Sequence, residues 1–100
     1  MTVQYSAVFE KRSDMVYISH LDLMNLFRRA FRRANLPFIL TEGFTPRIKI
    51  SIPQALKLGT ESKNEHMSFV LSEERDAKSV AEAINKELPE GIKILDISIA

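Results

Sequence analysis

The chain has 100 residues, a net charge of +1, 45% hydrophobic residues and 27% charged residues, the balance of one soluble globular domain with a single core. The absence of cysteine excludes disulfides, thiolate zinc sites, cysteine nucleophiles and cysteine-held iron–sulfur clusters. No apolar run approaches the ~20 residues of a transmembrane helix, and the first residues lack the order of a secretory signal, so we expect a cytoplasmic protein that does not associate with membranes.

The first predicted element is a strand over Val3–Phe9. Apolar and polar residues alternate there with a period of two, which is typical of a half-buried strand. The polar stretch Lys11–Asp14 predicts a turn, and Met15–Ile18 is expected to form a short extended segment. A helix is then predicted from Ser19, which can act as its N-cap, to about residues 34–35, because Pro37 disfavours helical backbone in the residue before it.

The predicted first helix divides into a core face and a basic surface. At roughly 100° per residue, one face collects the residues expected in the core: His20, Leu23, Met24, Phe27, Ala30, Phe31 and Ala34. Arg28 and Arg32 lie beside that face, and Arg29 and Arg33 lie almost opposite it. None of the four has an acidic residue three or four positions away, so like charges repel along the helix. This pattern predicts a compensating partner outside the helix.

The remaining elements predict a mixed fold. Phe38–Thr41, Arg47–Ile52 and His66–Leu71 are expected to be short strands. A second amphipathic helix follows, capped by Ser72 or Asp76 and ending before the Pro89 to Gly91 break. Ile92–Ile99 is the last predicted strand, and its apolar phase switches between residues 94 and 95, which indicates a bulge or burial on both faces. This order predicts a single α+β domain with a ferredoxin-like split βαβ arrangement, in which an antiparallel sheet carries two helices on one face.

Charge is distributed unevenly along the chain. Residues 1–60 carry nine basic and four acidic side chains, a net charge of +5, whereas residues 61–100 carry five basic and nine acidic side chains, a net charge of −4. Arginine forks suit phosphate oxygens, and an exposed aromatic residue can stack on a base, so we predict RNA binding. The predicted nucleic-acid-binding residues are Arg28, Arg29, Arg32, Arg33, Phe44, Arg47 and Lys49, with Lys57 nearby in a loop.

Two alternatives remain open at this point. In the first, the basic face meets acidic side chains in place of RNA. Phe44 then packs inward and the arginines pair with acids of the second half, such as Glu73, Glu74 and Glu82, or the basic face docks on an acidic protein. In the second, histidines and acids converge as a metal site or as a histidine-dependent ribonuclease; the candidates are His20, Asp22, Glu42, Glu61, Glu65 and His66. Capping explains Asp22, and burial in the core is expected for His20. We therefore predict no catalytic residue, metal ligand or cofactor.

Residues 17–62 resemble a bacterial family known as the radical-SAM-linked domain. The shared elements are Ser-His-Leu-Asp at Ser19–Asp22, Arg-Arg-Ala at Arg32–Ala34, Leu-Pro at Leu36–Pro37 and Glu-Gly-Phe-x-Pro at Glu42–Pro46. Family sequences usually have Asn where Thr45 stands, and His-Pro where Arg47 and Ile48 stand. These departures replace a histidine of the turn with a positive charge.

The resemblance implies a partner more than an activity. Domains of this family occur alone or at the end of radical S-adenosylmethionine proteins, many of which modify tRNA or proteins. This chain lacks the three-cysteine cluster motif of the enzyme itself. The resemblance therefore implies an accessory module that binds RNA or presents a substrate to such an enzyme. Because family members tend to be longer, residues 1–100 are expected to form either one complete domain or the N-terminal half of a longer one.

Overall fold

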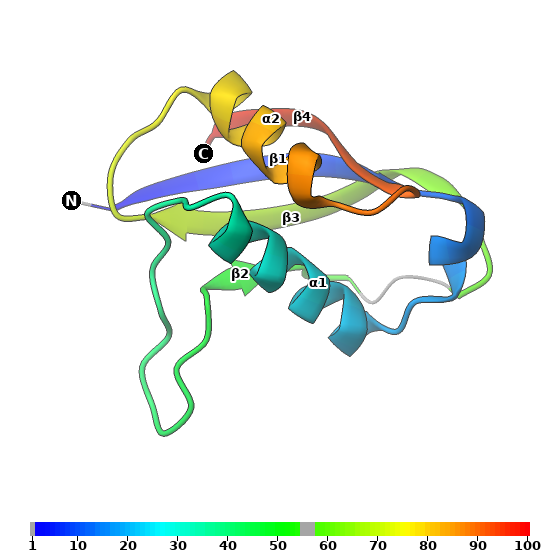
Figure 1. The fold of residues 1–100 in the computed structure, drawn as a ribbon, viewed down its shortest axis with the longest axis horizontal. Coiled ribbons are helices and arrows are strands. Elements are labelled where there is room, and N and C mark those ends of the chain that lie inside the picture. Colours follow the sequence, from blue (N-terminus) through cyan, green and yellow to red (C-terminus); the bar gives the residue numbers. More distant parts are fainter. Residues whose placement is uncertain (1, 55–57) are drawn as a thin grey trace.

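The computed structural model describes residues 2–54 and 58–100 and shows one four-stranded sheet with two helices. In chain order the elements are β1 (Val3–Lys11), α1 (His20–Arg33), β2 (Ile50–Ser51), β3 (Ser62–Leu71), α2 (Ala77–Glu87) and β4 (Ile92–Ile99). The strands are antiparallel in the order β2-β3-β1-β4, and both helices cover the same face (Figure 1). The predicted ferredoxin-like α+β arrangement is confirmed.

The core lies between the sheet and the helices. In β1, the side chains of Tyr5, Ala7 and Phe9 are buried, because alternate residues of a strand point to the same face. The two rings pack on neighbouring elements: Tyr5 stacks on Phe69 of β3, and Phe9 meets Phe27 of α1 edge to face. The Tyr5 hydroxyl also donates to the Arg75 carbonyl and accepts from the Arg75 amide, both at 2.7 Å. Tyr5 thereby fixes the segment that leads into α2.

Local signals in the sequence set the bounds of α1. The Ser19 side chain accepts a hydrogen bond from the Asp22 amide at 3.1 Å, as predicted for an N-cap. Burial begins only at Leu23, and the first turn of the helix carries no buried residue. The expectation that His20 is buried in the core was therefore wrong, because at this first helical position its side chain is exposed.

The α2–β4 unit contains the predicted bulge. Val8 of β1 pairs with Asp96 and Phe9 pairs with Ile94, so Leu95 is the extra residue, which confirms the bulge expected from the phase switch. Asp76 is the cap of α2, and its carboxylate accepts from the Ser79 amide. The amide side chain of Asn85 in α2 accepts from the Ile94 amide at 2.7 Å and donates to the Ile94 carbonyl at 3.0 Å.

Two predicted segments differ from the structure. Met15–Ile18 was expected to be extended, but Ser13–Tyr17 forms a 3-10 helix. Gly91 allows the chain leading into this 3-10 helix to pass close by. The φ of Gly91 is +103°, and a Cβ at this position would lie 2.6 Å from the Arg12 carbonyl oxygen. The predicted strands 38–41 and 47–52 contribute only β2 to the sheet, since Phe38 makes a single bridge to β3 and Leu40 pairs with Ile48 in a projecting hairpin (Figure 1).

Candidate nucleic-acid interface

Four arginines are distributed around the solvent side of α1. On one side, three of them line a hollow of about 480 Å³ between α1 and the hairpin. This outer hollow is lined by Leu21, Asn25, Arg28, Arg29, Arg32 and Arg47. On the other side, Arg29 and Arg33 line a separate pocket that faces α2. The predicted basic residues of α1 thus form a ridge with a depression on each side, and Arg29 contributes to both.

The hairpin between α1 and β2 brings the second group of predicted residues beside the helix. Its arms are joined by backbone hydrogen bonds from Thr41 to Arg47 at 2.7 Å and from Lys49 to Ile39 at 2.8 Å. The Thr41 hydroxyl also accepts from the Arg47 amide at 3.0 Å. These bonds hold the Arg47 backbone where the hairpin arm meets the turn, and the Arg47 side chain lines the outer hollow. Lys49 is exposed on the same arm.

Two of the arginines are oriented by neutral groups. The Arg28 guanidinium donates from Nε to the Ile48 carbonyl at 3.3 Å and from Nη1 to Asn25 at 3.4 Å. The Arg32 guanidinium carbon lies 5.6 Å from the centre of the Phe38 ring, a cation–π arrangement. Burial, and secondarily the positive charge of Arg47, lower the pKa of Arg28. An arginine remains cationic despite such a shift, so positive charges face each other across the hollow.

None of the predicted cationic residues forms an ion pair within the described parts of the chain. The salt bridges present there join Arg12 to Glu10 and Glu90, and Arg75 to Glu73. Arg12 is an ion-paired arginine for comparison. Its Nε donates a 2.7 Å hydrogen bond to the Glu10 carboxylate, which raises the pKa of Arg12. The alternative that the α1 arginines pair with Glu73, Glu74 and Glu82 is contradicted. Among the described residues, none of these cations therefore has a carboxylate within salt-bridge distance.

Phe44 lies at the tip of the projecting hairpin and is fully exposed, with a relative accessibility of 108%. The expectation that Phe44 packs inward is therefore contradicted. Gly43 beside it has a φ of +124°, a conformation that favours glycine and turns the chain at the tip. An aromatic ring held away from the core on a short hairpin is available for stacking. Lys57, the remaining basic residue of this region, lies outside the described residues.

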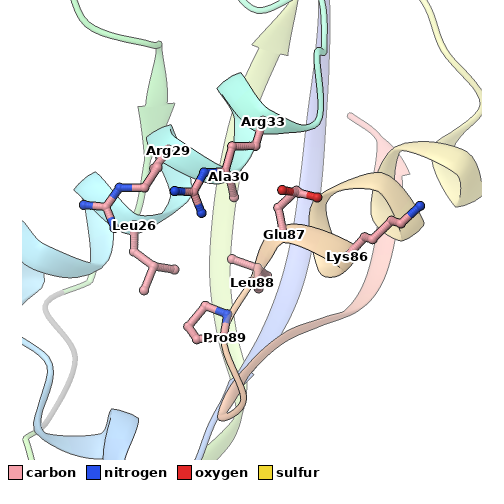
Figure 2. Close-up of a pocket in the computed structure, with 8 residues that line it drawn as sticks. All are labelled: Leu26, Arg29, Ala30, Arg33, Lys86, Glu87, Leu88 and Pro89. Atoms are coloured by element: carbon pink, nitrogen blue, oxygen red, sulfur yellow. The ribbon is translucent and has the colours of Figure 1, made fainter.

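The second depression, which we call the interhelix pocket, has a volume of about 340 Å³ and lies between α1 and the end of α2 (Figure 2). From α1 it is lined by Leu26, Arg29, Ala30 and Arg33. From α2 and the following turn it is lined by Lys86, Glu87, Leu88 and Pro89. Of these residues, the sequence predicted only Arg29 and Arg33 as binding residues; it assigned Ala30 to the core and Pro89 to the break after the second helix. One feature of the sequence could have indicated this pocket: Leu26 is an apolar residue that falls outside the predicted core face of the helix.

The face of the sheet away from the helices offers no stacking platform. Ser6 pairs with Ser68 and Ser98, and Ser68 pairs with Ser51, so small polar side chains cross all four strands on that face. The aromatic residues within the strands are Tyr5, Phe9 and Phe69, and all three are buried in the core. Bases cannot stack on strand aromatics here, and the hairpin tip supplies the exposed ring instead.

The histidines and acids considered as a metal or ribonuclease site do not gather. In residues 2–54 and 58–100, no group of three His, Asp or Glu side chains is arranged to hold a metal ion. Glu61 accepts a hydrogen bond from the Ser13 amide at 3.0 Å, and His66 is exposed on β3. The structure therefore brings the cationic residues together, whereas of these candidates only Glu65 and His66 share a pocket among the described residues.

Comparison with family models identifies the family of this chain. A family model described as "uncharacterized protein conserved in bacteria (DUF2344)" matches residues 4–100. The chain belongs to this family. No curated protein matches it. The matched residues include both helices, the hairpin and all of the sheet except Val3, so the basic surface and the interhelix pocket lie within the family domain. No helix in the described part of the chain is long and apolar enough to span a bilayer. The link to radical S-adenosylmethionine proteins stays a prediction from the sequence resemblance.

Proposed function

We propose that this chain is an RNA-binding module that presents structured RNA, such as tRNA, to a radical S-adenosylmethionine protein. The observation that supports binding is the group of cations around α1 without ionic partners in the described structure, placed beside a fully exposed aromatic ring. The group consists of Arg28, Arg29, Arg32, Arg33, Arg47 and Lys49. Phosphate groups of a nucleic acid would supply the missing negative charge.

The shape of the surface favours an extended polyanion over a small anion. The cations lie on both sides of the α1 ridge and continue onto the hairpin, so one small ligand cannot contact them all. Arginine predominates, and its planar fork can hold two phosphate oxygens at once. Phe44 adds a ring that can stack on an unpaired base, which an acidic protein surface would not require.

The partner half of the proposal depends on the resemblance of residues 17–62 to radical-SAM-linked domains. A module without cysteine can hold a substrate, while the cluster that starts the radical reaction belongs to the other protein. The role of this chain would then be to position RNA, and its own residues would contribute binding without chemistry.

Binding of a fluorescent RNA hairpin, measured by anisotropy at low salt, tests the proposal. We expect the double variant Arg29→Ala/Arg33→Ala to weaken binding by about tenfold or more, because it removes two phosphate contacts. Neither side chain has a hydrogen bond or ion pair within the described structure, so the double variant should fold normally.

The matched control is Lys78→Ala/Lys93→Ala, which also removes two positive charges. Lys78 in α2 and Lys93 in β4 are exposed and line neither the outer hollow nor the interhelix pocket. The control variant should bind RNA nearly as well as the wild type. Absence of RNA binding by the wild type at low salt would falsify the proposal, and capture of an acidic protein by the same arginines would favour a protein-docking role instead.

A further inference from the structure

The interhelix pocket differs from the rest of the basic surface because it combines cations with an apolar floor and one carboxylate. Leu26, Ala30 and Leu88 form the floor, and Arg29 and Arg33 approach from α1. A volume of about 340 Å³ is at the lower end of the range for small-ligand sites. A simple phosphate would leave this floor unused. We propose that the pocket receives one unpaired guanosine nucleotide of the bound RNA, an inference that rests on the proposed function.

The α1 side of the pocket suits the phosphate of such a nucleotide. In Figure 2 the Arg33 side chain extends back along α1, so that its guanidinium lies near that of Arg29. Two like-charged groups on one wall repel each other, and a phosphate between them relieves that repulsion while accepting several hydrogen bonds. The opposite wall also carries Lys86, but its amino group is directed away from α1 (Figure 2), so the phosphate belongs on the α1 wall.

The floor suits the face of a base. Leu26 and Leu88 are only partly buried, although both pack against the core, and Pro89 continues the apolar surface into the turn. A flat base laid on these side chains removes apolar surface from water on both partners. A base paired within a duplex cannot present its face in this way. The pocket therefore selects an unpaired nucleotide.

Glu87 indicates which base is bound. Its carboxylate projects from the end of α2 toward α1 (Figure 2), and it has no hydrogen bond or ion pair among the described residues. A carboxylate repels a phosphate, so in this pocket it must face donors of the ligand, either ribose hydroxyls, which all four nucleotides share, or N–H groups of the base, which differ between them. Guanine alone among the four bases presents two adjacent donors, N1–H and N2–H, that match the two oxygens of a carboxylate. Glu87 would thus favour guanosine over uridine.

The test is a titration of the full chain with GMP, AMP, CMP and UMP, which carry the same phosphate, followed by amide chemical shifts in NMR spectra. We expect shifts at residues 26–33 and 86–89, and GMP binding about tenfold tighter than UMP, the discrimination of one good bidentate contact. Glu87→Gln should remove most of this preference. Arg33→Ala should weaken all four nucleotides alike. The matched control, Glu82→Gln, removes the same charge from α2 outside the pocket and should leave the preference intact.

A parallel titration with an RNA hairpin separates this inference from the proposed function. If the wild type binds the hairpin but binds the four nucleotides equally or not at all, the guanosine pocket is overturned and RNA binding stands. If neither probe binds, both are overturned. If charge alone governed nucleotide binding, Glu87→Gln would have the opposite effect. Loss of a negative charge would then strengthen the binding of all four nucleotides.

Discussion

The salt dependence of RNA binding is the prediction that the structure defines most closely. Six uncompensated cations lie around α1 and on the hairpin arm, and each can replace one condensed counterion of RNA. At about −0.7 to −0.9 per phosphate contact, the slope of log K against log salt should be about −4 to −5. Affinity should therefore fall by several hundredfold to about a thousandfold between 50 and 200 mM salt.

Removing two of these cations should change the slope by a defined amount. Arg29→Ala/Arg33→Ala should reduce the steepness by about 1.5, because two contacts are lost. Lys78→Ala/Lys93→Ala should leave the slope unchanged. The assay is fluorescence anisotropy with one hairpin RNA at five or so salt concentrations. A wild-type slope shallower than about −2, or an equal change in both variants, would show that the α1 surface does not carry the phosphate contacts.

Three further substitutions test other parts of the structure. Phe44→Ala should weaken binding of single-stranded RNA by about 1–3 kcal/mol without changing the salt slope, since it removes stacking and no charge; an altered slope would contradict this. Gly91→Ala should lower the free energy of unfolding in urea by about 3 kcal/mol, because the positive φ and the close Arg12 carbonyl both oppose a Cβ; a loss under 1 kcal/mol would be inconsistent with that geometry. Tyr5→Phe should cost about 1–3 kcal/mol, measured the same way, by leaving the Arg75 amide and carbonyl without their partner; an unchanged unfolding midpoint would rule this out.

Elements with strong local signals could be predicted from the sequence. The Ser19 cap and Pro37 determined the bounds of α1, and the phase switch at Leu95 located the bulge in β4. Signals of this kind depend on residues close together in the chain. His20 shows where the approach fails, because a position on the apolar side of a helical wheel is buried only where the neighbouring sheet reaches it.

Only the residues that α1 and the hairpin contribute to the candidate site could be predicted from the sequence. Arginine spacing on α1 identified the ridge, whereas the pairing of Thr41 with Arg47 could not be predicted from the sequence and is seen only in the structure. The interhelix pocket requires the packing of α1 against the end of α2, which joins residues more than fifty positions apart. Glu87 has no sequence motif around it, and only the three-dimensional arrangement places its carboxylate opposite Arg33.

The paired hydrogen bonds between Asn85 and Ile94 have a consequence for association. β4 is an outermost strand, and such strands attract extended segments of other chains through their free amides and carbonyls. Asn85 occupies both of these groups at Ile94, and the extra residue at Leu95 interrupts the regular spacing that an incoming strand would need. The sheet therefore cannot grow in register past β4. At this edge of the sheet, a partner would therefore have to bind through side chains and not through strand pairing.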